Sequence, residues 1–338
     1  MHKIQKALMT VLLRVSRVKV WSLLALCVAV ACGAEECKTA SEMDAGAKSA
    51  MEAAAQRYYK AAAAGNTAEL QQNAIPAIAS DFSGIQGAIT ENKANLGTSA
   101  TIRSSYELDA PGTAPIARAE FFCGIINSPN YVAFAIPNLP PGNYGVVMLD
   151  PEGGKNPVTV TFVLQQSGAQ WKIGGVYIRP TAISGHDSQW YVTQAQQYKA
   201  KGQIHNAWFY YLTAWDLSAP VPFMGSKKLD KLVDEMQSAR PPDVASKAQP
   251  LQLAGTGKTY SVTDLFPLPT ADGLGLVVKY AVQDVSNTNA AFADNMAVMK
   301  ALVAKYPEFR EGFVSIVARA VAPSGQDYGT LLAMKDVK

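Results

Sequence analysis

The sequence predicts an α+β fold built from three units of modest size. Alanine-rich helical segments come first, a block of short strands follows, and a second block of strands around one helix ends the chain. A helical stretch separates the two blocks. Helices and strands that are segregated along a chain are typical of α+β units, in which helices cover one face of an antiparallel sheet. The 338 residues are enough for two or three such units.

The first unit is expected over residues 44–180 and begins with helices. Apolar residues recur every three or four positions over 51–62, and Gly65 stops this helix. A second helix follows and bends or breaks at Pro76. Residues 83–97 predict a short third helical piece.

Short segments rich in β-branched and aromatic residues come next, separated by Pro, Gly, Asn and Asp. They are ATIRSSYEL (100–108), ARAEFFCGII (117–126), YVAFAIP (131–137), NYGVVML (143–149), VTVTFVLQQ (158–166) and QWKIGGVYI (170–178). The clearest turns lie at 140–143 and 167–168. We therefore expect a curved antiparallel sheet with the helices on one of its faces.

This order of elements resembles the NTF2-like (cystatin-like) superfamily, in which a bent sheet wraps around N-terminal helices to form a cone. The resemblance covers 44–180 and is carried by Tyr58–Tyr59, the alanines that lead to Gly65–Asn66, and Trp171–Ile173. It implies a cone that holds a small apolar ligand, or a sheet face that pairs with a second copy. It also implies an alternative, an enzyme like the isomerases and dehydratases of that superfamily, with a carboxylate base in the cone.

Aromatic side chains crowd onto the strands of this unit and supply the candidate ligand-binding residues. They are Phe121, Tyr131, Phe134, Tyr144, Trp171 and Tyr177. Rings of this size also fill protein cores, and that is the more ordinary explanation for them. The carboxylates that could serve the enzymatic alternative are Glu107, Asp109, Glu120 and Asp150.

Residues 181–240 predict a helical hairpin followed by a further helix. Over 187–220 the sequence resembles one tetratricopeptide-type hairpin, on Tyr191, Ala195, Tyr198, Gly202, Ala207, Tyr211 and Ala214. It departs from that pattern at Gln194, where an apolar residue is usual, and at Pro220, which lies one position late. A single hairpin cannot bury its own apolar face. The hairpin is therefore expected to pack on a neighbouring unit, or to bind a protein partner.

Residues 241–250 have the composition of a linker, and 251–338 predict a small C-terminal α+β unit. Its helix starts near Thr288 and is expected to lie on an antiparallel sheet. The predicted strands are PLQLAG (250–255), KTYSVTDL (258–265), LGLVVKYAVQDV (274–285), GFVSIVARAVA (312–322) and YGTLLAMKDV (328–337).

Residues 1–31 predict a signal peptide. They hold five cations and no acid, and they end in twelve uncharged residues that are mostly apolar. As a helix, that run is about 18 Å long, short of the roughly 30 Å hydrocarbon core of a bilayer. The protein is therefore expected to be exported.

The end of the signal allows two outcomes. Ala29–Ala31 suit ordinary signal peptidase, whereas the following Cys32 resembles the cysteine of a bacterial lipobox, which becomes a lipid-modified N-terminus. Ala29 departs from the lipobox, which prefers a larger aliphatic residue there. Lipidation of Cys32, which would anchor the protein to a membrane, and free secretion to the periplasm therefore both stay open. Residues 32–43 are expected to form a flexible leader.

The net charge of the chain gives no electrostatic support for nucleic-acid binding. The chain has 30 Lys and Arg against 27 Asp and Glu, a net charge of +3. Without 1–31 the balance becomes 25 against 27, a net charge of −2. Nucleic-acid binding needs a basic face, which a near-neutral chain does not indicate.

Cys37 and Cys123 are the cysteines left in the folded part. In an oxidising compartment they could pair. Alternatively, Cys123 is a small buried hydrophobe and Cys37 lies in the leader, which is the interpretation we favour because the leader is predicted to be flexible.

The sequence indicates no cofactor or metal. Residues 255–259 (GTGKT) end like a P-loop, but Gln252 stands where its first glycine belongs and a strand follows in place of a helix. His186 and His205 have no partner at metal-ligand spacing. The leading hypothesis is a non-catalytic envelope protein for binding or scaffolding, which takes a small apolar ligand or a protein partner. The alternative is the NTF2-like enzyme described above.

Overall fold

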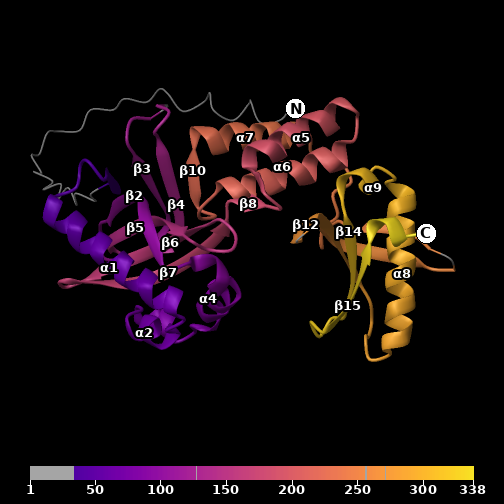
Figure 1. Cartoon of the computed structure of the whole chain (residues 1–338), viewed down its shortest axis with the longest axis horizontal. Coiled ribbons are helices and arrows are strands. Elements are labelled where there is room, and N and C mark those ends of the chain that lie inside the picture. Colours follow the sequence, from indigo (N-terminus) through magenta and orange to yellow (C-terminus); the bar gives the residue numbers. More distant parts are fainter. Residues whose placement is uncertain (1–33, 127, 256, 271) are drawn as a thin grey trace, which may run out of the picture. The chain divides into compact units, whose positions relative to one another are not determined.

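The computed structural model describes residues 34–126, 128–255, 257–270 and 272–338. The predicted signal peptide and Cys32 lie outside the described residues. Within them, helices and several mainly antiparallel sheets combine in an α+β fold, which confirms the predicted class (Figure 1). None of the helices in these ranges combines the length and the apolar character needed to cross a bilayer.

Helices open the first unit, as the alanine-rich pattern predicts. The side chain of Asp44 accepts hydrogen bonds from the amides of Gly46 and Ala47 and so caps the first helix, which ends at Gly65 with a positive φ of 78°. The expected break at Pro76 is observed, because a new helix starts there. The helices are α1 (Ala45–Ala64), α2 (Thr67–Gln72), α3 (Pro76–Ala79) and α4 (Ser83–Leu96).

The main sheet of this unit has five antiparallel strands in the order β1-β2-β5-β6-β7. They are β1 (Glu36–Thr39), β2 (Ser99–Ala110), β5 (Gly142–Glu152), β6 (Val158–Ser167) and β7 (Gln170–Pro180). Apolar side chains of α1, α2 and α4 pack on one face of this sheet, so the helices cover that face as expected.

The expectation that all six strand segments share one sheet is wrong. β3 (Ile116–Cys123) and β4 (Val132–Leu139) form a separate sheet with β10 (Met224–Ser226). The reason lies in β5, whose run over 144–149 is buried completely along its length. A strand that is apolar at successive positions must be covered on both faces. The β3–β4 hairpin supplies the second cover, with Phe121 packed in the same core as Val146.

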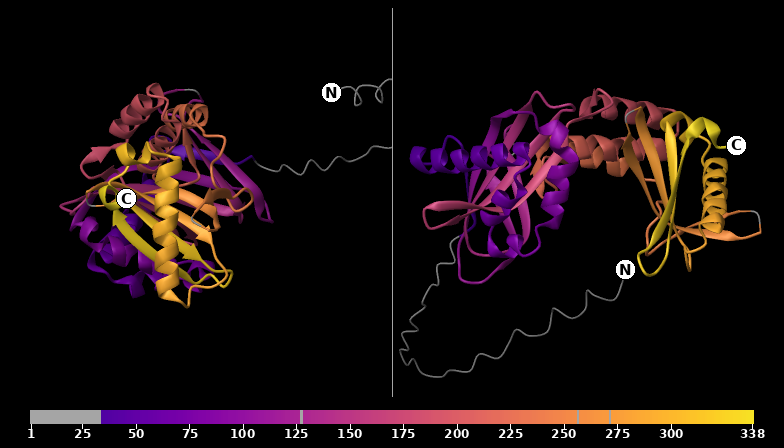
Figure 2. Two further views of the ribbon diagram at one scale, coloured as in Figure 1. Left: turned by 90° about the vertical axis from the view of Figure 1, so that its right-hand side faces the viewer. Right: turned by 60° about the horizontal axis from the view of Figure 1, so that its bottom comes forward.

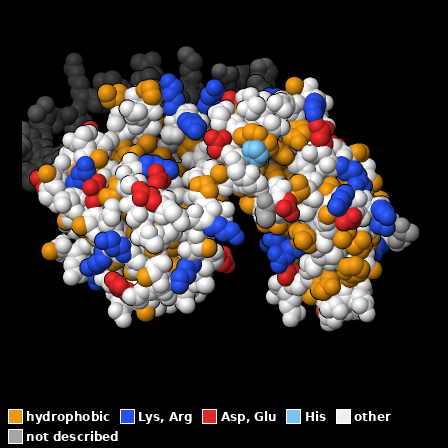
Figure 3. Space-filling model, viewed as in Figure 1, with side chains coloured by type: hydrophobic (Ala, Val, Ile, Leu, Met, Phe, Trp, Pro, Cys, Tyr) orange, Lys and Arg blue, Asp and Glu red, His pale blue; other side chains and the backbone are white. Residues whose placement is uncertain are grey.

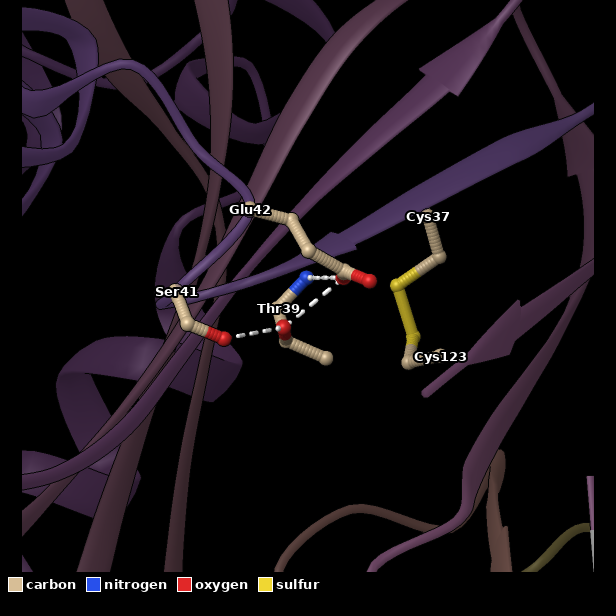
Figure 4. Close-up of a disulfide and its surroundings, with 5 residues drawn as sticks. All are labelled: Cys37, Thr39, Ser41, Glu42 and Cys123. Carbon is tan, nitrogen blue, oxygen red and sulfur yellow. Dashed lines mark hydrogen bonds between the residues drawn. A yellow bond between two sulfur atoms is a disulfide. The ribbon is translucent and has the colours of Figure 1, made fainter. Parts of the chain in front are cut away.

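A flexible leader was expected over 32–43, but from Glu36 onward the structure shows a strand and a turn instead. β1 pairs with β2 at the sheet edge, and a disulfide joins Cys37 to Cys123 of β3 across 86 positions of the sequence (Figure 4). The turn after β1 is also tied, because the amide of Thr39 donates to the Glu42 carboxylate over 2.8 Å. These backbone and side-chain hydrogen bonds lower the pKa of Glu42. The interpretation of two unpaired cysteines is therefore wrong. Pairing the backbone with β2 orders a segment whose own sequence is too short and polar to predict a strand.

The predicted helical hairpin and further helix are present over 181–240. A two-stranded ribbon of β8 (Ala182–Ile183) and β9 (His186–Asp187) leads into them. The helices are α5 (Ser188–Ala200), α6 (Ile204–Ser218) and α7 (Lys227–Ser238). The aromatic face of the hairpin shares one hydrophobic core with the C-terminal unit, so it packs within the chain.

The C-terminal unit is a five-stranded sheet in the order β11-β12-β13-β14-β15, with α8 along one face (Figure 2). One expectation is wrong: β13 and β14 are parallel, because the chain crosses over through α8 between them. The elements are β11 (Leu251–Ala254), β12 (Thr259–Thr270), β13 (Gly273–Ala281), α8 (Thr288–Lys305), α9 (Phe309–Gly312), β14 (Ser315–Val321), β15 (Asp327–Ala333) and a 3₁₀ turn (Met334–Asp336).

Candidate functional site

Four of the six candidate ligand-binding aromatics meet in the core between the two sheets of the first unit. Phe121 and Phe134 are cross-strand neighbours on β3 and β4, and both are fully buried. Tyr144 and Tyr177 join them from the main sheet, and the Tyr177 ring lies 5.6 Å from that of Phe223, which precedes β10. These rings pack against one another and against aliphatic side chains, as core residues do.

The other two candidates lie elsewhere. Trp171 faces the helices on the opposite side of the main sheet, and its carbonyl accepts a hydrogen bond of 2.6 Å from the Tyr58 hydroxyl. Tyr131 precedes β4 and stacks on Phe122 with ring centroids 6.3 Å apart. The six residues therefore do not form one site.

The four carboxylates considered for a general base are all in contact with solvent. Glu120 is exposed and pairs with Arg118. Asp150 pairs with Arg103, whose Nε lies 2.9 Å from its carboxylate. Glu107 and Asp109 are partly exposed. The buried polar residues of the first unit are the hydroxyl-bearing Ser105, Thr159 and Thr161, so none of the four meets the requirement for a desolvated base.

The two histidines of the folded part have aromatic or acidic neighbours. The His186 ring stacks on Trp190 with centroids 3.8 Å apart. His205 Nε2 lies 2.8 Å from Asp243, and its Nδ1 lies 3.3 Å from Glu308. In the part of the chain that the structure describes, no group of three or more His, Cys, Asp or Glu side chains is placed to hold a metal ion.

A pocket of about 930 Å³ opens where the helical hairpin meets the C-terminal sheet. The hairpin contributes aromatic walls from Trp190, Tyr191 and Tyr210. Leu331 and Ala333 of β15 line it from the sheet. We call this the hairpin pocket. Sequence reasoning missed this pocket. Its only signal was the aromatic-rich face of the hairpin, and the sheet residues that complete the pocket lie far along the chain, as Leu331 does.

Two of the polar side chains around the hairpin pocket, Tyr210 and Arg310, hold the fold together. The Tyr210 hydroxyl donates to the carbonyl of Gly312 over 2.7 Å. Arg310 donates to the carbonyls of Met334 and Val337 over 3.1 and 2.6 Å, which ties α9 to the chain end. Burial raises the pKa of Tyr191 to about 12 and that of Tyr210 further, so both phenols are neutral at physiological pH. Asp272, Glu311 and Lys335 also line the pocket, so it combines aromatic, apolar and charged groups, and its two phenols are not activated bases.

The sheet face opposite α8 carries a row of apolar side chains. Paired positions run across four strands through Phe266, Val277, Val317 and Leu331. Alternate positions such as Leu276, Val278 and Ile316 belong to the core under α8 instead. The row ends at Leu331, whose side chain is 62% exposed. We call this set the apolar row.

β15 is an edge strand with an unusual composition. It reads DYGTLLA, and its only charged residue, Asp327, is at its start and pairs with Arg319 of β14. The remaining residues are uncharged and include no proline. An edge strand presents unpaired backbone donors and acceptors, and natural proteins usually guard them with charges, prolines, bulges or short length.

No protein-family model, curated protein or solved structure matches this chain. The resemblances to the NTF2-like superfamily and to a tetratricopeptide hairpin therefore stay predictions.

Proposed function

We propose that this protein is an exported, non-catalytic binding protein that captures an extended segment of a protein partner along β15. The observation that carries the proposal is the unguarded edge of β15, next to exposed Leu331 and continuous with the hairpin pocket. An added strand would satisfy the edge backbone by main-chain hydrogen bonds, and its side chains would supply specificity.

A comparison with the other described edges supports this choice of strand. β7 carries Lys172 and Arg179, and β3 carries Arg118 and Glu120. β1, β10 and β11 have four residues or fewer. Among the described edge strands, β15 alone combines seven residues with an uncharged interior. Charges and short length prevent pairing at an edge, so β15 is the edge best suited to accept a partner strand.

The surroundings of β15 favour an apolar partner segment. A strand that pairs with β15 would extend the apolar row beyond Leu331 on the helix-free face. Further along β15, Ala333 lines the hairpin pocket, so a side chain of the same segment can enter between Trp190 and the sheet. Buried apolar area of this kind would add to the affinity of the main-chain hydrogen bonds and would select apolar side chains.

The other parts of the chain bear on where the protein is found and on the fold of its first unit. The signal-like residues 1–31 favour export. After export the protein is either anchored to a membrane by a lipid on Cys32 or secreted without a lipid. We propose the NTF2-like cone for residues 44–180, supported by helices on one face of an antiparallel sheet. The core between its helices and its main sheet is filled by side chains such as Tyr58 and Phe162, and the core between the two sheets by Phe121 and Phe134, so we assign the partner to β15 rather than to the cone.

Photo-crosslinking in producing cells tests the proposal. A photoreactive amino acid replaces Leu331 in the full chain, and in a matched control it replaces Phe292, which is 47% exposed on α8. We expect a crosslinked product of discrete mass at 331 and none at 292. Sequencing of the crosslinked peptide should identify one protein and an uncharged, extended segment of it.

The affinity of the purified partner for variants of this chain then measures how much β15 contributes to binding. Leu331→Lys places a charge on the edge and should weaken binding by about tenfold or more, whereas Phe292→Lys should leave it unchanged. A crosslink at 331 to a second copy of this chain would replace the proposed partner by self-association. The absence of any product at 331 would overturn the proposal.

A further inference from the structure

The loop between β3 and β4 exposes a compact group of large apolar side chains. Ile125 is 80% exposed, Ile126 60% and Phe122 49%, and Tyr131 stacks on Phe122. We call these four residues the hairpin tip. In the space-filling view of Figure 3, hydrophobic side chains gather at the upper edge over the β3–β4 hairpin, with Lys or Arg side chains beside them. Exposed apolar groups that cluster in this way mark an interaction surface rather than ordinary surface composition.

Lysines stand next to the hairpin tip. β10 pairs with β4 and ends at Ser226, opposite Val132, the first residue of β4. Lys227 and Lys228 follow directly as the first residues of α7. Cations are unfavourable at a helix N-terminus, where the helix dipole is positive. Asp230 in the same turn of α7 offsets part of that cost, and burial together with the nearby carboxylates of Asp230 and Glu120 raises the pKa of Tyr131. An anionic surface in front of the hairpin tip would therefore be contacted through Lys228 rather than through the whole end of the helix.

The disulfide brings the N-terminal part of the folded chain to the same end of the hairpin. Cys123 is the last residue of β3 before the loop, and it is bonded to Cys37. Cys32 is five positions before Cys37. Five extended residues span at most about 17 Å. A lipid on Cys32 would therefore be attached to the chain no further than that from Cys37.

We propose that the hairpin tip inserts into the anionic surface of a lipid bilayer, with Ile125 and Ile126 in the acyl boundary. The aromatic pair would lie at the level of the headgroups, where amphipathic rings are favoured, and Lys228 would meet the lipid phosphates. The inference rests on the proposed export but not on the β15 site. It applies whether or not Cys32 is acylated, because the tip supplies apolar contacts and Lys228 of α7 supplies a cationic one.

Vesicle sedimentation of the full exported chain tests this inference. Cys32→Ser removes any acyl chain, and vesicles contain equal parts of phosphatidylethanolamine and phosphatidylglycerol, with phosphatidylcholine alone as the neutral comparison. We expect the Cys32→Ser protein to sediment with the anionic vesicles. Adding Ile125→Asp and Ile126→Asp together should reduce the bound fraction by about tenfold or more. Phe292→Asp, a matched exposed apolar position on α8, should have no effect.

Two further variants separate the electrostatic contribution to vesicle binding from the insertion of apolar side chains. Lys228→Ala should weaken binding to anionic vesicles by severalfold and leave neutral vesicles unchanged. Ile125→Trp should show a blue shift of its fluorescence with vesicles and none without them. The inference is overturned if the Cys32→Ser protein fails to sediment, or if Phe292→Asp loses as much binding as the tip variant. Crosslinking at Leu331 should be unaffected by the tip variants, so this test and that of the proposed function can fail independently.

Discussion

Single residues decide how the ends of the first unit are held. Cys37 lies in a strand of four residues that no local pattern predicts, and its bond to Cys123 joins that strand to the covering hairpin. From the sequence, pairing was the less favoured of two outcomes, because Cys37 lies in a segment predicted to be a flexible leader. Only the packing of β1 beside β2 and of β3 over the main sheet brings the two sulfurs together.

Removing this disulfide should destabilise the protein strongly. For a loop closed across 86 positions, the chain-entropy relation gives about 4–5 kcal/mol. We expect Cys37→Ala with Cys123→Ala to lower the free energy of unfolding by about that amount, measured by urea denaturation. The wild-type chain should show no reactive thiol at these positions until it is reduced. Free thiols at both positions in the oxidised mature protein would contradict the bond.

At the scale of elements, close packing joins α6 of the hairpin to α9 of the C-terminal unit. Asn206 is fully buried, and its side-chain amide donates to the carbonyl of Glu308 over 2.7 Å and to Gln203 over 3.0 Å. Gly312 faces this amide, and a Cβ at that position would lie 2.6 Å from Asn206 Oδ1. The two elements therefore approach as closely as they do because position 312 has no side chain.

Gly312→Ala should separate these elements and destabilise the protein. Overpacking of this kind costs about 1–3 kcal/mol, and the displaced Asn206 would also lose hydrogen bonds. Thermal or urea unfolding gives the change in stability. Gly87→Ala is the matched control, because its Cβ would meet nothing within 4 Å and alanine favours the α4 helix by about 1 kcal/mol. Equal effects of the two substitutions would refute the packing argument.

At the scale of the whole molecule, the boundary predicted between the helical hairpin and the C-terminal unit does not separate two hydrophobic cores. Residues 241–250 have the composition of a linker, yet Asp243 accepts a hydrogen bond of 2.5 Å from the Tyr306 hydroxyl and lies 2.8 Å from His205. The hairpin turn, the linker and the end of α8 are thereby joined. Because the hairpin and the C-terminal sheet also share one hydrophobic core, we expect 181–338 to unfold together.

This junction should make stability depend on pH on the acid side. Burial alone would raise the pKa of Asp243, but hydrogen bonds from Tyr306 and His205 outweigh it and hold the pKa below its usual 3.8. A carboxyl whose pKa is lower in the folded chain stabilises it above the unfolded value, and this contribution is lost as pH falls through the folded value.

Asp243→Asn should therefore lower the urea midpoint at neutral pH, and the difference from wild type should shrink below about pH 4. Asp234→Asn, at an exposed position of α7, serves as the control and should follow the wild type at every pH. A constant difference between Asp243→Asn and wild type across the acid range would argue against the linkage.

The sequence by itself determined the positions of the helices and most strands, the α+β class and the signal-like first residues. These follow from local patterns, such as the three-to-four spacing over 51–62 and the β-branched runs on either side of Gly168. Tertiary structure alone decided that β3 and β4 form a sheet of their own and that β13 and β14 are parallel. It also divided the aromatic candidates of the first unit between two cores and the β3–β4 loop. It also placed the hairpin pocket beside the unguarded edge of β15. The physical reason is that each of these features depends on contacts between residues far apart in the chain, which local periodicity does not encode.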